Sequence, residues 1–387
     1  MNQRTASGPA SPFYTEDHEN FRAQVRRFVD REIAHHIEQW EAAGELPREL
    51  HRKAAEAGVL GVGFPETCGG IEVPDGFYGI VVTEELARAG SGGLLASLMS
   101  HGIASPPIVN VGTPEQKERF VAPVLAGDKI AALAITEPSG GSDVANIRTT
   151  ARREGDHYVV NGSKTFITSG MRADLLTVAV RTGDAGLGGV SLLVIEAGTP
   201  GFTRSKLEKM GWWCSDTATL YFDECRVPVV NRIGAENAGF MAIMLNFNNE
   251  RIMLAAQAWA FAKLCYEEAL AYARERQTFG KPLITRQVIR HKLVDMKTQI
   301  DAVKAQLDLL CWRVSKRQMP VAEVCMLKNL ATRTLEDVAG EAVQILGGAG
   351  YLRGAKVERV FRETKVLSIG GGATEIMKDL AARQLGY

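Results

Sequence analysis

The stretch Thr136-Glu137-Pro138-Ser139-Gly140-Gly141-Ser142-Asp143 marks a change in the character of this 387-residue chain. It follows an apolar run, residues 130–135, and combines hydroxyl side chains with glycines at the end of a predicted strand. Glycine lets the main chain approach a ligand, and successive backbone N–H groups can line an anion or a heteroaromatic ring. Taken alone, the stretch is compatible with a binding loop and also with an ordinary Gly-rich connection.

The sequence before this stretch has a helical period. Apolar residues recur at steps of three and four, with charges between them: Phe21, Val25, Phe28 and Val29. A second helical segment covers residues 47–57. We therefore expect an N-terminal helical domain over residues 13–127. Residues 1–12 are rich in Ser, Ala, Gly and Pro, which predicts a flexible tail.

The sequence after the stretch changes to short β-branched runs separated by turn residues. These runs cover residues 157–160, 175–180, 190–195 and 218–222. Gly155-Asp156 between two alternating runs predicts a hairpin turn. Because no long helix separates the strands, a βαβ nucleotide-binding fold is disfavoured. The pattern predicts an antiparallel β domain over residues 128–236.

Long helical stretches return after Gly239. They cover residues 240–276, 284–319, 320–346 and 375–385, with short connections between them. Such a set predicts a helical bundle over residues 237–387. The fold class is therefore α+β, in the order helical, β, helical.

Composition limits the partners. Lys+Arg and Asp+Glu both total 45, so no overall positive field attracts nucleic acid or an anionic membrane surface. The six cysteines show no Cys-x-x-Cys pair and no metal-ligand spacing, which predicts isolated buried thiols and no metal site. With no apolar run near 18 residues and no basic-then-apolar leader, the sequence favours a reducing cytoplasm.

Three further stretches join the first in one order along the chain: residues 161–170 (NGSKTFITSG), 274–282 (RERQTFGKP) and 344–351 (QILGGAGY). Together the four resemble the motifs of the acyl-CoA dehydrogenase family, and the resemblance runs from about Phe13 to the C-terminus. It implies an N-terminal helical domain, a middle β domain and a C-terminal four-helix bundle. It also implies FAD, an acyl-CoA substrate converted to the trans-2-enoyl-CoA in fatty acid β-oxidation, an electron-transfer flavoprotein as acceptor, and a homotetramer or homodimer.

The resemblance assigns cofactor roles to particular residues. It places Thr136 beside the flavin pyrimidine, Ser142 near the pyrophosphate and the substrate, and Thr168 near flavin N5. It assigns further contacts with the ADP half of the neighbouring subunit's FAD to Arg276, Phe279, Gln344, Gly347 and Gly348. The planar guanidinium of Arg276 suits a pyrophosphate, although a solvated charge at a helix end is an alternative.

Departures from the family pattern affect the flavin contacts. Phe166 stands where the family usually has Trp, so an aromatic ring is kept and the indole N–H is lost, which affects acceptor docking more than flavin binding. Ala373 stands where the family often has Thr. Glu375 falls where the family places Gln or Glu near the adenosine, and an ordinary first-turn carboxylate is the alternative.

The position of the catalytic base is the most informative departure. Medium-chain and short-chain branches carry a glutamate in the final Gly-rich turn, and this chain has Gly371 there. The isovaleryl and long-chain branches carry it in a Glu-Arg pair on a bundle helix, which matches Glu250-Arg251 here. An apolar stretch surrounds Glu250, and desolvation raises a carboxyl pKa towards neutrality, as a general base requires. A simple ion pair with Arg251 is the alternative.

By resemblance, the Gly371 N–H would polarise the thioester carbonyl, and Arg251 would help to place the carboxylate or the pantetheine chain. The small residues of segment 91–101 predict room for a medium to long or methyl-branched acyl chain, with His101 structural. A same-fold flavin oxidase or monooxygenase that reacts with dioxygen is the main alternative. The DNA-binding adaptive-response branch is disfavoured, because net charge is zero and Glu250 is intact.

Overall fold

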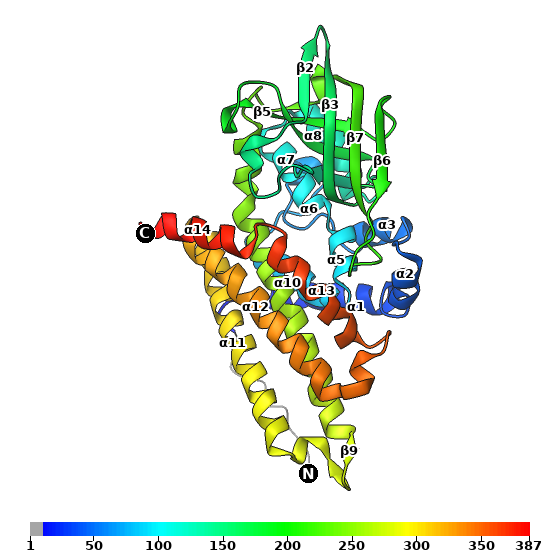
Figure 1. The fold of residues 1–387 in the computed structure, drawn as a ribbon, viewed down its shortest axis with the longest axis vertical. Coiled ribbons are helices and arrows are strands. Elements are labelled where there is room, and N and C mark those ends of the chain that lie inside the picture. Colours follow the sequence, from blue (N-terminus) through cyan, green and yellow to red (C-terminus); the bar gives the residue numbers. More distant parts are fainter. Residues whose placement is uncertain (1–10) are drawn as a thin grey trace.

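A computed structural model describes residues 11–387. Figure 1 shows a β unit at one end, long C-terminal helices at the other, and the N-terminal helices beside the junction between them. This arrangement confirms the predicted helical, β, helical order and the α+β class. The tail predicted over residues 1–12 falls almost entirely outside the described residues.

The N-terminal part is a set of helices. They are α1 (Glu16–Glu32), α2 (Ile37–Ala43), α3 (Glu49–Glu56), α4 (Phe77–Ala87), α5 (Gly92–Leu98), α6 (His101–Ala104), α7 (Pro106–Val111), α8 (Pro114–Phe120) and α9 (Ala122–Leu125). On α1, Val25, Phe28 and Val29 are buried, as their spacing predicts. A capping box starts α8, where Thr113 Oγ1 accepts a hydrogen bond from Gln116 N–H and Gln116 Oε1 accepts one from Thr113 N–H.

The middle part is one sheet with the strand order β6-β7-β3-β2-β4-β5-β8, and β1 pairs with β4. The strands are β1 (Ala131–Ala134), β2 (Thr150–Glu154), β3 (His157–Thr168), β4 (Leu175–Arg181), β5 (Val190–Glu196), β6 (Phe202–Lys206), β7 (Thr217–Pro228) and β8 (Arg232–Ile233). Glu154 pairs with His157, which confirms the Gly155-Asp156 hairpin. Most strand pairs are antiparallel, as predicted, but β1 and β2 both pair with β4 in parallel, which the prediction did not include. Alternation identifies strands but not their partners.

Both faces of the sheet are buried at its central strands β4 and β5. Leu176 and Val178 of β4 belong to one hydrophobic cluster, while Leu175 and Ala179 belong to another. The second cluster also contains residues of α7, α8 and α9, so these short helices cover that face. Because successive side chains of a strand point to opposite faces, β4 is buried at almost every position.

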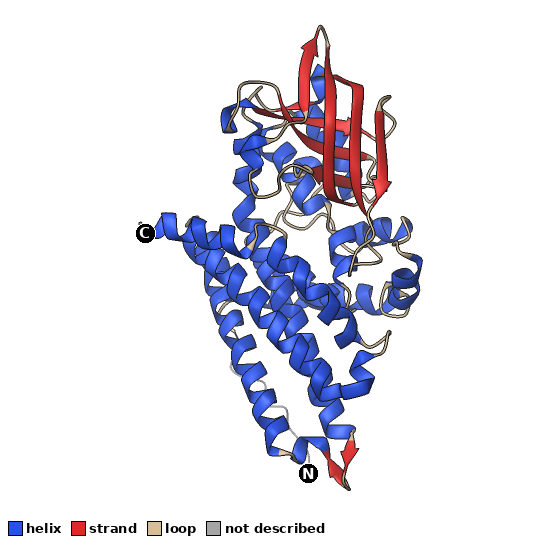
Figure 2. Cartoon of the chain, in the orientation of Figure 1, coloured by secondary structure: helices blue, strands red, loops and turns tan. Residues whose placement is uncertain are grey.

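The C-terminal part is a helical bundle (Figure 2). Its helices are α10 (Gly239–Glu275), α11 (Gln287–Ser315), α12 (Val321–Leu346), α13 (Lys356–Ile369) and α14 (Thr374–Leu385), with a small hairpin of β9 (Gln277–Thr278) and β10 (Lys281–Pro282) after α10. The sequence did not predict α13. It lies between two Gly-rich turns, and Val357, Val360 and Leu367 are buried on it at helical spacing.

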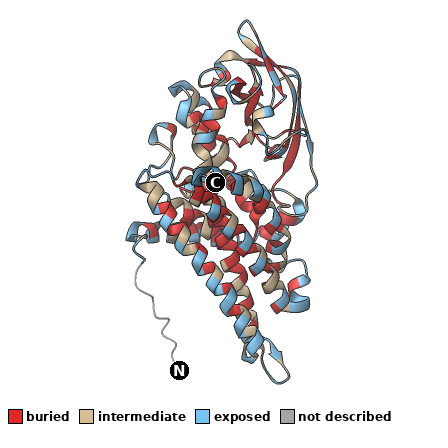
Figure 3. Cartoon of the chain, turned by 60° about the vertical axis from the view of Figure 1, so that its left-hand side comes forward, coloured by how far each residue is buried: buried red, intermediate tan, exposed pale blue. Residues whose placement is uncertain are grey.

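One hydrophobic core joins the N-terminal helices to the bundle (Figure 3). It contains Ile80 of α4 together with Ala255 of α10 and Val338 of α12. The first turns of α10 belong instead to a cluster under the sheet, through Ala242 and Ile243. Thus α10 links the two parts, and a side chain near its first third lies between them.

The six cysteines are all buried and free, as predicted. Within residues 11–387, no single helix is long and apolar enough to cross a membrane; one bent pair, Gly92–Leu98 with His101–Val111, meets the length and composition test.

Candidate active site

Glu250 lies on α10 where the bundle meets the C-terminal turn. Its side chain is partly buried, and its Oε1 lies 3.7 Å from the position that a Cβ on Gly371 would occupy. The structure therefore brings together the two positions, far apart in the sequence, at which a catalytic carboxylate was considered.

Burial raises the pKa of Glu250 above its ordinary value, and Arg251 and Lys328 each oppose part of that rise. Within the described residues, no hydrogen bond or ion pair neutralises the Glu250 carboxylate. A desolvated carboxylate without a partner is a better proton acceptor than a solvated one. The site can therefore remove a proton from a bound molecule.

The C-terminal turn at residues 370–372 has a backbone that excludes side chains. Gly371 has φ +65° and Gly372 has φ +105°, the left-handed region that favours glycine. In addition, Leu254 Cδ1 occupies the space that a Cβ on Gly371 would take. Within the described chain, the exposed Gly371 donates no hydrogen bond through its backbone N–H. That N–H is available to a ligand.

Lys328, which sequence reasoning missed, holds this turn from α12. Its side chain is fully buried, and its Nζ donates a 2.7 Å hydrogen bond to the Gly372 carbonyl. The next residue, Asn329, donates from Nδ2 to the Thr374 carbonyl at 3.0 Å. The signal in the sequence was a lysine inside an otherwise apolar helix face.

Arg251 follows Glu250 and is buried. Its guanidinium carbon lies 5.3 Å from the ring centroid of Phe247, and its Nε has no hydrogen-bond partner among the described residues. Arg251 and Lys328 both lower the pKa of Glu250, so the structure brings the two cations to the same region. The positive charge near Glu250 comes from two helices, α10 and α12.

The β domain presents a first group of predicted cofactor residues. Thr136 follows β1 and is tied to β3, because its carbonyl accepts from Thr165 N–H at 2.9 Å and its hydroxyl donates to the Thr165 carbonyl. Phe166 sits at a bulge of β3 with φ +61°, and its side chain is 71% exposed. Thr168 ends β3, and Ser142 is exposed in the Gly-rich loop. An exposed aromatic ring beside hydroxyls fits a planar heteroaromatic ligand.

Glu137, also missed, shapes the Gly-rich loop. Its carboxylate accepts hydrogen bonds from the N–H groups of Arg148 and Thr149 and from Lys164 Nζ, the last at 2.8 Å. Burial alone would raise the pKa of Glu137, but Lys164 and the two N–H groups hold it below its ordinary value. The loop is therefore anchored by an ionised carboxylate.

The bundle presents a second group at its other end, near β9 in Figure 1. Arg276 directly follows α10, and Phe279 of the β9–β10 hairpin is 97% exposed with φ +51°. Gln344, Gly347 and Gly348 are exposed where α12 ends. Because Glu250 lies 25 residues before the end of α10 at Glu275, roughly 38 Å along the helix, a single chain does not bring this group to Glu250. Glu375, in contrast, is exposed at the start of α14 near the C-terminal turn.

The predicted acyl-pocket segment differs from expectation. A Cβ on Gly92 would meet the indole of Trp212, and one on Gly93 would meet Cys214 Sγ. These glycines therefore allow the loop after β6 to pack closely against α5, and the space beside them is not free for an acyl chain. His101 is buried with its Nε2 2.9 Å from the Leu60 carbonyl, which fits a structural role.

Comparison with known proteins gives a consistent result. Three family models match, described as acyl-CoA dehydrogenase N-terminal domain (residues 15–128), middle domain (132–225) and C-terminal domain (237–386). The long-chain specific mitochondrial acyl-CoA dehydrogenase of Rattus norvegicus is 38% identical over 96% of this chain and 87% of its own.

Solved structures agree with the sequence matches. One described as a probable acyl CoA dehydrogenase from Mycobacterium abscessus is 50% identical, with a TM-score of 0.95 over 97% of this chain and 100% of its own. A chain of the structure named electron transferring flavoprotein of Acidaminococcus fermentans is 34% identical, with a TM-score of 0.92 over 96% and 98%.

Proposed function

The chain belongs to the acyl-CoA dehydrogenase family and catalyses FAD-dependent dehydrogenation of an acyl-CoA thioester, and we propose that Glu250 is the base of this reaction. The observation that carries the proposal is the approach of Glu250 Oε1 to the Gly371 turn. The family places its base at one of these two positions, and only one of them holds a carboxylate here.

In the proposed mechanism, FAD supplies the hydride acceptor when it is bound. Glu250 removes the α proton of the thioester, and its burial raises the pKa of this carboxylate, which suits a general base. The free N–H of Gly371 donates to the thioester carbonyl, where negative charge develops as the proton leaves. Arg251 supplies positive charge beside Glu250 and so favours its ionised form.

Glu250→Gln tests the base directly. The amide keeps size and hydrogen bonding but cannot accept a proton, so anaerobic flavin reduction should slow by roughly 100 to 10,000-fold while acyl-CoA still binds. Glu267→Gln is the matched control, because it makes the same change at an exposed site on the same helix. Reduction at the wild-type rate in Glu250→Gln would show that the base lies elsewhere.

We infer a medium to long or methyl-branched acyl chain. Support comes from the position of the base, on a bundle helix as in the long-chain and isovaleryl branches, and from the likeness to a long-chain specific enzyme. The filled space at Gly92 and Gly93 gives no support. A panel of acyl-CoA esters should bleach the flavin anaerobically faster with longer or branched chains than with butyryl-CoA. Preference for butyryl-CoA would contradict this inference.

We also infer that a second subunit completes each FAD site, in a homodimer or homotetramer. The two groups of predicted cofactor residues lie at different ends of α10, and apolar side chains near the second group are exposed, including Phe279, Tyr351 and Leu352. Arg276→Ala should weaken FAD retention on gel filtration, with Arg274→Ala as the neighbouring control. A monomer that keeps one FAD per chain would contradict the shared site.

The proposed electron acceptor is an electron-transfer flavoprotein in the cytoplasm, within fatty acid β-oxidation. The structural likeness to a chain of an electron transferring flavoprotein structure supports this type of partner. The alternative, an oxidase or monooxygenase, predicts rapid reoxidation of the substrate-reduced flavin by dioxygen. Slow reoxidation in air and fast reoxidation by an electron-transfer flavoprotein would favour the dehydrogenase.

A further inference from the structure

The ammonium group of Lys328 is buried beneath the C-terminal turn at residues 370–372. Its side chain has 0% exposure, and its Nζ reaches the Gly372 carbonyl at 2.7 Å from α12. This is the one hydrogen bond that Nζ makes within residues 11–387. A buried cation with so little direct compensation is costly unless anionic groups lie close to it.

A second contact from the same helix fixes the other side of the turn. Asn329 Nδ2 donates to the Thr374 carbonyl at 3.0 Å. Consecutive residues of α12 thus hold two carbonyls on either side of Ala373. The turn carries Gly371, so α12 sets where the Gly371 N–H lies relative to α10.

The charged and titratable groups that face Lys328 come from three helices. They are Arg251 and Glu250 on α10, Cys325 on α12 and Glu375 on α14. Burial, with Arg251 adding to it, lowers the pKa of Lys328 to about 8, while Glu250 opposes the fall. Lys328 therefore remains mostly protonated at neutral pH. In turn, its charge lowers the pKa of Glu250.

We propose that Lys328 is a positioning residue for the reaction: it fixes the turn that carries Gly371 and, together with Arg251, places positive charge near Glu250. This proposal rests on Glu250 as the base. It assigns one side chain two tasks, the hydrogen bond to Gly372 and the charge near Glu250, and substitutions separate the two.

Lys328→Met removes both the donor and the charge while keeping chain length. In flavin-loaded protein, the acid limb of anaerobic flavin reduction should move to higher pH by roughly one unit, because an opposite charge is lost near the carboxylate. The maximal reduction rate should fall by about tenfold or more with acyl-CoA affinity little changed, and Lys328→Arg should keep the wild-type midpoint. The substrate is the acyl-CoA that bleaches the flavin fastest in the panel above.

Asn329→Ala is the matched control for a merely structural effect. It loosens the same turn without removing a charge, so its rate can fall while its pH midpoint stays at the wild-type value. If Lys328→Met does not load flavin, Lys328→Gln carries the same test, since it removes the charge and keeps a donor. A wild-type midpoint in the neutral variant overturns the proposal, and a raised midpoint supports it.

The outcomes also separate this proposal from the one on which it rests. If wild-type protein shows no acid limb, or Glu250→Gln keeps one at the wild-type rate, Glu250 is not the base. If the wild-type limb depends on Glu250 and the neutral Lys328 variant leaves it unmoved, only the role of Lys328 fails.

Discussion

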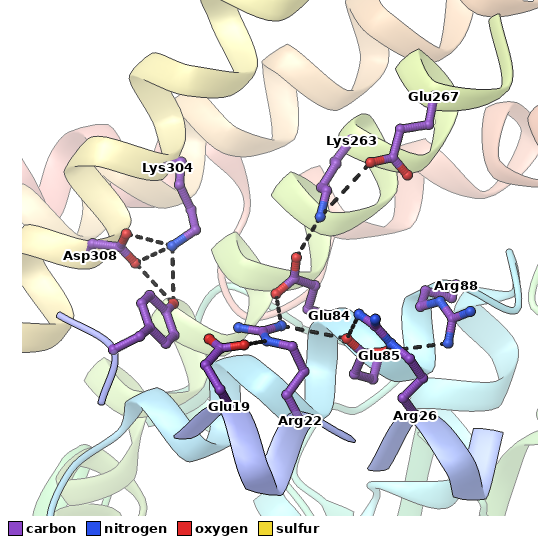
Figure 4. Close-up of polar contacts among 11 residues, drawn as sticks. Glu19, Arg22, Arg26, Glu84, Glu85, Arg88, Lys263, Glu267, Lys304 and Asp308 are labelled. Atoms are coloured by element: carbon purple, nitrogen blue, oxygen red, sulfur yellow. Dashed lines mark hydrogen bonds and ion pairs between the residues drawn. The ribbon is translucent and has the colours of Figure 1, made fainter. Parts of the chain in front are cut away.

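Two polar regions lie along α10, and their carboxylates have different surroundings. Near Lys263, α10 and α11 meet α1 and α4, and the carboxylates there are paired with cations (Figure 4). Near Glu250, the same helix meets α12 and the C-terminal turn, and the carboxylate is unpaired within the described chain. The surrounding charges, and not the helix itself, distinguish a structural carboxylate from a reactive one.

Glu84 illustrates the paired region. It accepts from Lys263 Nζ at 2.7 Å and is also paired with Arg22. Burial alone would raise the pKa of Glu84, but these two cations hold it below its ordinary value. The neighbouring Glu85, which is 1% exposed, accepts two hydrogen bonds from Arg26. The carboxylate of Glu84 is therefore fixed and ionised, so it is a poor proton acceptor.

Glu250 has the opposite balance. Its burial outweighs the attraction of Arg251 and Lys328, and its pKa rises. The two cations nearby are held by other contacts: Lys328 by the Gly372 carbonyl, and Arg251 against Phe247. The lesson is that positive charge near a carboxylate leaves it free to react when no donor reaches its oxygens.

The largest expected difference between the two regions is in pH dependence. Flavin reduction should fall about tenfold for each pH unit below the pKa of Glu250, since protonated Glu250 cannot act as base. Because that pKa is raised, the fall should begin above the ordinary range of a glutamate. Anaerobic stopped-flow measurements over pH 5 to 9 test this. A rate that does not change with pH would contradict the idea that the Glu250 carboxylate reacts while the paired carboxylates do not.

The effect of pH on the free energy of unfolding has opposite signs at Glu84 and Glu250. Its folded-state pKa is lowered, so its contribution is present above the unfolded pKa of about 4.3 and is lost as pH falls through the folded pKa. At Glu250 the folded pKa is raised, so its ionisation lowers stability as pH rises from the unfolded to the folded pKa.

A substitution at Glu84 should separate stability from activity. Glu84→Gln leaves Lys263 and Arg22 without their shared carboxylate, and we expect a loss of about 2 kcal/mol in the free energy of unfolding, below the full value for a buried pair because Lys263 is 39% exposed. Flavin reduction should stay within about twofold of wild type. Urea unfolding of flavin-loaded protein measures the loss. If Glu267→Gln lowered the free energy of unfolding equally, the loss would come from any change next to Lys263 and not from the pairing of Glu84 with both Lys263 and Arg22.

The smallest expected effect is at the exposed edge of the paired region. Arg26 is 51% exposed, and Arg22 and Arg88 also lie near Glu85, so Arg26→Ala should lower stability by about 1 kcal/mol or less. The difference from wild type should shrink as salt is added, because exposed pairs are screened. If Arg26→Ala lowered the free energy of unfolding as much as Glu84→Gln, the exposure of an ion pair would not determine its contribution to stability here.

Local patterns allowed much of this molecule to be predicted. The Gly155-Asp156 hairpin and the stripe on α1 follow from a few adjacent residues. Glu250 was singled out by the resemblance to the family, whose alternative base position matches Glu250-Arg251 when the turn holds Gly371, together with the apolar stretch around this carboxylate. Its role as base stays a prediction that the experiments above test.

Features that depend on distant contacts were not predictable in this way. The parallel pairing of β1 with β4 depends on how the chain returns to the sheet. The space next to Gly92 is filled by Trp212, which is 120 positions away in the sequence. The role of Lys328 becomes visible only through its hydrogen bond to Gly372, in the turn between α13 and α14. In each case the decisive contact is with a residue far away in the sequence, which the spacing of apolar residues does not reveal.

The packing of Leu254 against Gly371 also constrains how such an enzyme can change. A lineage that moved its carboxylate from α10 to the turn must move or shrink the Leu254 side chain, whose end fills the space next to Gly371, and must accept an unfavourable backbone there. If Glu250 were lost before that, the intermediate would have no base. If it were kept, two facing carboxylates would repel, and one would stay protonated. The two carboxylate positions therefore exclude each other, and the packing of Leu254 adds a cost to any exchange between them.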